Sequence, residues 1–325
     1  MEKKNIIGIA TLIIFVFSLI ITVPITFLTI VLSPYGIIDE SYSFSYEPIS
    51  PSTIEKLYIT ADVGNIEIRY IDPADDYYAL IDVYFMMSGV KLARKSYEDY
   101  FNIQWNKSSS PANFTIQIIS DDWFNPSLWL TKDVNIVVNL RRDVIFDIST
   151  IIKKGNLNIT VPWGVYVNNI HANVIDGHTF YDFNQCVISG DVSANITEGN
   201  FNLRSYNMEY TQNCNWLLNI IGGDMNIEIY QYKEMGANIT GTAIISTGVI
   251  NLFYHDSSAN IGAKLYFPLS WWYIPTTQPG FESTILVNGF FYKSNDFPTN
   301  SNYNISFYHL GGQGPPNHFI EINSD

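Results

Sequence analysis

Residues 153–164 read KKGNLNITVPWG, and this short phrase contains the pattern that decides the fold. After Gly155, every second residue from Leu157 to Val161 is apolar, and the residues between them are polar. Strict alternation predicts a β-strand with one face toward a core and the other toward water. We therefore expect Leu157 to point inward and Asn158 to point outward.

The phrase recurs along the chain. A glycine precedes an alternating run at Gly155, Gly177, Gly199, Gly223 and Gly248, with intervals of 22, 22, 24 and 25 residues. Glycine suits a tight corner because it adopts positive φ at no steric cost. A unit this short cannot bury its apolar face alone, so neighbouring units must stack. The sequence predicts an all-β fold, a β-solenoid or β-roll of stacked two-strand repeats. An antiparallel β-sandwich is the alternative, because short strands at regular spacing also fit one.

Composition narrows the class of protein. The chain has 325 residues, 47% of them hydrophobic and only 15% charged, which is enough apolar material for a large core and is not typical of a disordered chain. The formal net charge is −14, and no basic stripe is present. Nucleic acid is excluded as a partner, because a phosphate backbone is bound by clustered Lys and Arg.

The N-terminus predicts a membrane anchor. Residues 6–32 contain no charged side chain, and a helix of this length reaches about 40 Å, enough to cross a bilayer. Lys3 and Lys4 precede the run and acidic residues follow it, which places the N-terminus in the cytoplasm. A cleaved signal peptide is the alternative, but its apolar region is usually shorter. We expect a signal-anchor at 1–33, a linker at 34–56 and an extracytoplasmic β-repeat domain at 57–325. The protein would be a single-pass protein of the cell membrane whose C-terminal domain is extracellular.

Two kinds of modification fit an exported chain. Cys186 and Cys214 are candidates for one disulfide, with two free buried thiols as the alternative. Six N-x-[ST] sequons are candidate glycosylation sites, although an Asn-rich sequence also produces such triplets by chance. They begin at Asn106, Asn113, Asn158, Asn195, Asn238 and Asn304.

No motif for catalysis, cofactor binding or metal binding is present. The five histidines show no metal-ligand spacing, and the paired carboxylates, such as Asp121 with Asp122, are typical of turns. No Walker loop, nucleophile elbow or zinc-protease motif occurs. We predict no catalytic residue, no cofactor and no metal. Aromatic residues in loops are the candidate ligand contacts, with core packing as the alternative, and they are Trp123, Trp129, Trp271, Trp272 and Tyr273.

The stretches LYITADVGNIEIRYID (57–72) and VNIVVNLRRDVIFDISTIIKKGNLNITVP (134–162), with the recurring glycine units, resemble the prokaryotic putative adhesin family, a domain of unknown function found in β-repeat envelope proteins. The resemblance covers about residues 57–325. It implies a β-repeat fold and a surface location. The family has no established catalytic motif, so the resemblance implies no site residue.

These observations together predict a membrane-anchored binding or structural protein of the cell surface, adhesin-like and without catalytic activity. Its partners would be the lipid bilayer, through residues 6–32, and glycans or surface proteins. The first alternative is a surface carbohydrate-active enzyme on a β-helix scaffold, which would need convergent carboxylates. The second is an accessory subunit of an envelope sensor.

Overall fold

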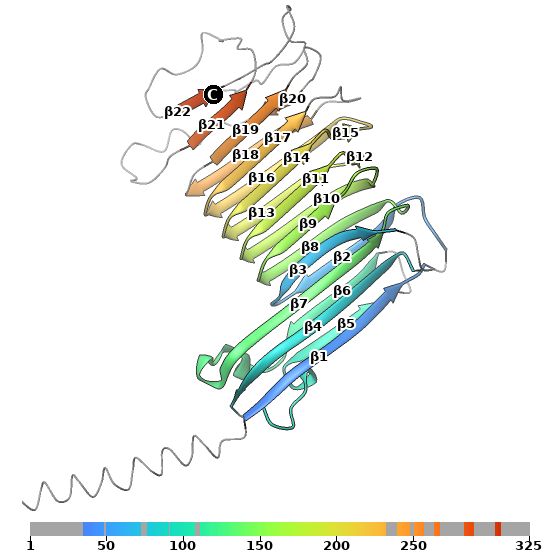
Figure 1. The fold of residues 1–325 in the computed structure, drawn as a ribbon, viewed down its shortest axis with the longest axis vertical. Coiled ribbons are helices and arrows are strands. Elements are labelled where there is room, and N and C mark those ends of the chain that lie inside the picture. The colour runs from blue at the N-terminus through green and yellow to red at the C-terminus, as the bar shows by residue number, and fades with distance from the viewer. Residues whose placement is uncertain are drawn as a thin grey trace, which may run out of the picture.

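The computed structural model describes residues 35–48, 50–72, 77–90, 92–107, 111–231, 239–247, 250–256, 263–266, 283–288 and 303–306. Within these ranges the protein is all-β, with two open sheets that face each other across a shared core (Figure 1). The only helices among the described residues are short 3-10 turns, η1 (Tyr97–Asp99), η2 (Asp121–Phe124) and η3 (Pro126–Leu128). None of the helices described is long and apolar enough to cross a membrane, and the span expected at 6–32 lies outside the described residues.

The first sheet, sheet A, begins with the strands nearest the N-terminus. In spatial order it contains β1 (Tyr35–Tyr46), β4 (Ala79–Val90), β7 (Trp129–Arg141), β3 (Asn65–Ile71), β9 (Leu157–Val161), β11 (Thr179–Asn184), β14 (Phe201–Tyr206), β17 (Met225–Gln231), β19 (Ile250–Asp256), β21 (Ser283–Asn288) and β22 (Tyr303–Ser306).

The second sheet, sheet B, lies against the first. In spatial order it contains β20 (Ala263–Tyr266), β18 (Ile239–Thr247), β16 (Cys214–Gly222), β13 (Val192–Glu198), β10 (Tyr166–Asp176), β8 (Phe146–Lys154), β2 (Glu55–Ala61), β6 (Ala112–Ile118) and β5 (Phe101–Asn106). Two short strands, β12 (Val187–Ile188) and β15 (Glu209–Tyr210), extend it beside β10.

The strands that follow β8 pair in parallel, whereas the antiparallel pairs lie among the strands that precede it. From β8 to β21, apart from the short strands β12 and β15, the chain alternates between the two sheets. From β10 onward each of these strands pairs in parallel with the preceding long strand of its own sheet. In sheet A, Leu157 pairs with Thr179 and Thr179 with Phe201, each 22 residues further on. Antiparallel pairing, which the sandwich alternative requires, joins β1 to β4, β4 to β7 and β5 to β6 among the described strands.

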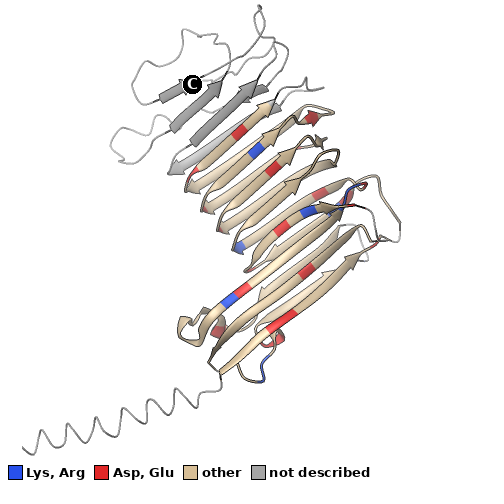
Figure 2. Cartoon of the chain, in the orientation of Figure 1, with Lys and Arg blue, Asp and Glu red and all other residues tan. Residues whose placement is uncertain are grey.

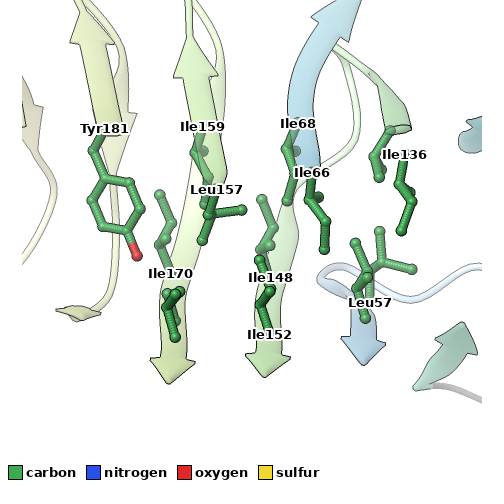
Figure 3. Close-up of a cluster of buried hydrophobic side chains, with 14 of the residues drawn as sticks. Leu57, Ile66, Ile68, Ile136, Ile148, Ile152, Leu157, Ile159, Ile170 and Tyr181 are labelled. Atoms are coloured by element: carbon green, nitrogen blue, oxygen red, sulfur yellow. The ribbon is translucent and has the colours of Figure 1, made fainter. Parts of the chain in front are cut away.

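The core lies between the sheets and is built from in-register columns of apolar side chains (Figure 3). Leu157 of β9 is buried and Asn158 is half-buried on the outer face, so the predicted direction of these two side chains is confirmed. Small residues accommodate large ones across the gap. Ala172 and Ala194 lie in sheet B, and the ring of Tyr181 reaches across to them from sheet A. Its hydroxyl donates to the carbonyl oxygen of Ser193 in sheet B at 3.1 Å. Columns of this kind hold successive strands at a constant spacing.

The glycines of the repeated phrase stack on one another at a corner. Gly177 and Gly199 have φ of +154° and +135°, in the region that other residues rarely adopt. A Cβ at Gly177 would overlap the carbonyl oxygen of Gly155, and a Cβ at Gly199 would overlap that of Gly177. Gly223 meets Gly199 in the same way. Glycine is therefore required here both for its positive φ and because the adjacent strand connection leaves no room for a side chain.

The polar residues that follow the glycines form a chain of hydrogen bonds along the corner. Asn156 Nδ2 donates to Asn65 Oδ1 at 3.0 Å, and the backbone N–H of His178 donates to Asn156 Oδ1 at 2.9 Å. The N–H of Asn200 then donates to His178 Nδ1 at 3.1 Å, and the N–H of Asp224 to Asn200 Oδ1 at 2.9 Å. Each side chain thus satisfies a backbone donor at the corner of the next turn of chain, which accounts for the polar residue after the glycine.

Residues 34–56, expected to be a linker, contain strand β1 instead. β1 pairs with β4 along its whole length, and Ile38 and Tyr46 are buried in the core. The Tyr46 hydroxyl donates to the carboxylate of buried Glu55 at 2.7 Å, and burial together with this bond raises the pKa of Tyr46. The linker prediction was wrong because residues 41–46 alternate serine with aromatic residues, a pattern that suits an edge strand equally well.

Candidate functional site

The outer face of sheet A carries a set of polar and aromatic side chains with a shared geometry. We call this set the ladder face. It lies on β11, β14 and β17, and adjacent strands align its members in columns. The ladder face consists of Phe180, Asp182, Asn202, Arg204, Tyr206, Asn226, Glu228 and Tyr230.

Charges alternate along one column of the ladder face. Arg204 donates to Asp182 from Nε at 3.1 Å and from Nη2 at 2.8 Å, and Glu228 follows in register on the next strand. The hydrogen bond and charge of Asp182 raise the pKa of the Arg204 guanidinium, with Glu228 a smaller contributor. Figure 2 shows acidic and basic residues alternating across these strands. Because Arg204 is exposed, this ion pair contributes little to stability and its charges remain accessible to a partner.

Amides and aromatic rings occupy the flanking columns. Asn226 Nδ2 donates to Asn202 Oδ1 at 3.0 Å. The rings of Tyr206 and Tyr230 have centroids 6.5 Å apart and an angle of 43° between their planes. Adjacent strands repeat at about 4.8 Å, so these groups form a flat array rather than a closed cavity. Aromatic faces pack against the apolar faces of sugar rings, and amide, carboxylate and guanidinium groups hydrogen-bond their hydroxyls.

Sequence inspection did not identify the ladder face. Its members are ordinary polar positions of alternating strands, and only the register between strands brings them together. The 22-residue interval was a usable signal, because Asp182 and Arg204 are separated by that interval and so are placed side by side.

Two of the loop aromatic residues predicted as ligand contacts, Trp123 and Trp129, pack against other side chains. Trp123 is buried, with its ring centroid 4.9 Å from that of Phe101 and 5.4 Å from that of Trp129. The Lys132 ammonium lies 4.7 Å from the Trp123 ring centroid, and burial lowers the pKa of Lys132. Trp129 is half-buried and donates from Nε1 to the Asp122 carbonyl oxygen at 3.0 Å. These two residues hold the 120–130 loop against the sheet.

Packing is therefore the role of Trp123 and Trp129, and the expectation of exposed ligand contacts was wrong for Trp123. The remaining nominated aromatics, Trp271, Trp272 and Tyr273, lie outside the described residues.

The two cysteines are free and buried, so the disulfide candidate was wrong and its alternative holds. Cys186 Sγ lies 3.3 Å from Met208 Sδ, and Cys214 lies at the start of β16. Burial raises the pKa of both thiols, that of Cys214 to about 12. Protonated, buried thiols are unreactive at neutral pH.

The sequons are spread over both sheets. Asn106 ends β5 and Asn195 lies on the outer face of β13, and both are exposed. Asn113 and Asn158 are half-buried. Asn304 lies in β22, and Asn238 is outside the described residues. Glycosylation stays a prediction for all six.

Two carboxylates of sheet B, Asp147 and Asp191, accept hydrogen bonds from amide and backbone groups. Asp147 Oδ1 accepts from Asn168 Nδ2 at 2.7 Å and from the Asn169 N–H at 3.1 Å. Asp191 Oδ1 accepts from the Asn215 N–H at 2.8 Å, at the equivalent corner two turns of chain later. No group of three or more His, Cys, Asp or Glu residues in the described part of the chain is arranged to hold a metal ion.

Comparisons with known proteins add little. No protein-family model matches the chain, and no curated protein sequence does. The crystal structure of a putative cell adhesion protein from Clostridium sporogenes is similar over 59% of this chain and 99% of that one, with 13% identity and a TM-score of 0.38. That of a putative lipid binding protein from Parabacteroides distasonis is similar over 89% and 97%, with 12% identity and a TM-score of 0.29. Both TM-scores are below 0.5, too low for an inference about this chain.

Proposed function

We propose that this protein is an adhesin-like binding module of the cell surface, without catalytic activity. Residues 6–32 anchor it in the membrane with the N-terminus in the cytoplasm, and the strands from β8 onward form a β-solenoid that carries the binding surface outside the cell. The 22-residue parallel pairing between successive strands supports the solenoid, because each turn of chain returns in register to the same sheet.

The ladder face is the observation that carries the proposal. It combines a tyrosine pair, an amide pair and an exposed charge column on one flat surface, a combination suited to the ring faces and hydroxyls of a glycan. A flat array binds an extended polymer along its length, one sugar after another, rather than enclosing a small molecule. We assign the glycan contact to Tyr206, Arg204 and their neighbours in the adjacent strands.

The carbohydrate-active enzyme is the less favoured function. Glycoside hydrolysis needs two carboxyl groups flanking one bond, about 5–10 Å apart and free to exchange protons. The described carboxylates at the sheet corners, Asp147 and Asp191, are instead engaged by neighbouring amides and backbone N–H groups. No observation favours the sensor subunit over a binding module.

A glycan array tests the proposal with a matched pair of variants. The full chain in phosphatidylcholine nanodiscs is applied with and without calcium, alongside Tyr206→Ala and Tyr58→Ala. Both tyrosines are about equally exposed, 40% and 41%, but Tyr206 belongs to the ladder face and Tyr58 to the outer face of sheet B. We expect Tyr206→Ala to weaken binding about tenfold, the value of one aromatic contact, and Tyr58→Ala to leave it unchanged. Equal effects of both variants, or no glycan bound, would contradict the assignment.

A further inference from the structure

One end of the molecule exposes large apolar side chains that the core does not use. Tyr35 and Ile37 project from the start of β1, and Phe124 and Leu130 lie in and beside the loop that precedes β7. Phe124 is 68% and Leu130 75% exposed. The strand register brings the two groups to the same end, because Ile37 pairs with Ser88 of β4 and Ser88 with Thr131 of β7. Figure 1 shows the start of β1 and the start of β7 together at this end. We call these four residues the apolar end.

The loop that presents Phe124 is firmly built. Its neighbour Trp123 is buried, and the Lys132 ammonium donates to the Trp123 carbonyl oxygen at 2.8 Å. Ser120 and Asn125 cap η2 and η3 through their side-chain oxygens. Because the loop is clamped from inside, Phe124 is held in the solvent rather than folded back onto the sheet. A group of large exposed apolar side chains at one end of a protein marks a site of contact with another protein or a membrane.

The sequence identifies which partner lies at this end. The membrane span expected at 6–32 ends three residues before Tyr35, and three residues span at most about 11 Å. An anchor that ends there holds the apolar end at the lipid headgroups. Aromatic and aliphatic side chains are favoured in that interfacial layer.

Electrostatic attraction to anionic lipids does not bring the apolar end to a membrane. Arg94 and Lys95 are exposed near this end, but so are Glu98, Asp121 and Asp122. Lys95 is also paired with Asp99 at 2.8 Å. With both signs present on a chain of net charge −14, an anionic surface offers no net gain. Apolar insertion into a neutral interface is what the surface supports.

We propose that the apolar end docks on the bilayer that holds the anchor, with Phe124 and Leu130 inserted into the boundary between headgroups and acyl chains. The docking rests on the proposed anchoring and adds a second contact to it. Two contacts fix the orientation of the rigid domain, so that the ladder face is carried at a defined angle to the membrane instead of swivelling on its tether.

Depth-dependent quenching tests the docking on the full chain. A fluorophore is attached to Asp121→Cys, an exposed position beside Phe124, in phosphatidylcholine nanodiscs containing doxyl-labelled phosphatidylcholine. The control label is at Leu217→Cys, exposed on β16. The unsubstituted chain measures background labelling, because its own thiols are buried. We expect strong quenching at 121, none at 217, and no change in 0.5 M NaCl. Quenching that is equal at both positions, or abolished by salt, would overturn the proposal.

A second pair of variants isolates the inserted side chain. Adding Phe124→Ser to the 121-labelled chain removes the apolar contact and should lower the ratio of docked to undocked molecules about tenfold or more. Ile175→Ser removes an exposed apolar side chain from the outer face of sheet B and should change nothing. A chain that fails to co-purify with nanodiscs refutes the anchor itself. A chain that co-purifies but shows no quenching at 121 refutes only the docking.

Discussion

The stacked glycine corner makes a quantitative prediction about Gly199→Ala. The backbone at this position has φ of +135°, and holding a non-glycine residue there costs about 1–3 kcal/mol. The new Cβ would also overlap the Gly177 carbonyl oxygen, so the two turns of chain must separate. That separation strains the neighbouring bonds, among them Gly199 N to Gly222 O at 2.9 Å and Gly177 N to Glu198 O at 2.9 Å. We expect a total loss of at least about 3 kcal/mol in the free energy of unfolding.

Gly164→Ala is the matched control. Gly164 also has positive φ, +74°, but a Cβ there would meet nothing within 4 Å, so only the backbone cost of about 1 kcal/mol applies. Thermal unfolding followed by far-ultraviolet circular dichroism measures both variants. A loss of 1 kcal/mol lowers Tm by about 2–4 °C in a domain of 150–250 residues, so we expect about 6–12 °C for Gly199→Ala against about 2–4 °C for Gly164→Ala. Melting temperatures that agree within 2 °C would refute the stacked corner.

Three further predictions follow from burial and register. Ile196→Asp should unfold the domain at room temperature, because the side chain points into the core. Asn195→Asp, one residue earlier and exposed, should have the melting temperature of the parent protein. Similar circular dichroism spectra for both variants would contradict the register of β13. The thiols of Cys186 and Cys214 should not react with a thiol reagent at pH 8 until the protein is denatured, and then both should react without prior reduction; a mass that is 2 Da low would instead reveal a disulfide. The Tyr42 hydroxyl donates a hydrogen bond to the Glu40 carboxylate at 2.8 Å. This bond raises the pKa of Tyr42 to about 12, above its value of about 10 in the unfolded chain. The stability it provides is fully present below pH 10 and is lost as the pH rises from 10 to 12, so Tyr42→Phe should flatten the fall in Tm over that range, and an unchanged slope would count against the bond.

The structure also shows where inference from local pattern fails. β1 was interpreted as a linker because its residues 41–46 alternate serine with aromatic residues, and nothing in that stretch reveals that β4 lies beside it. Cys186 and Cys214 are close enough in sequence to suggest a bridge, yet Cys186 packs against Met208 instead. In each case the deciding contact joins residues at least 22 positions apart, and no local rule supplies that information.

The local pattern by itself determined the elements of the repeated units: strands from the alternation of apolar and polar residues, corners from the glycines, and the inward direction of residues such as Leu157. These properties depend on a residue and its immediate neighbours, because pleating and φ preference are local. Only the tertiary structure decided which strands are adjacent, and therefore that Asp182 meets Arg204 and that Trp123 is buried while Phe124 is exposed. Surfaces of this kind are created by register and packing between distant segments, which is why the ladder face and the apolar end became visible only in the folded chain.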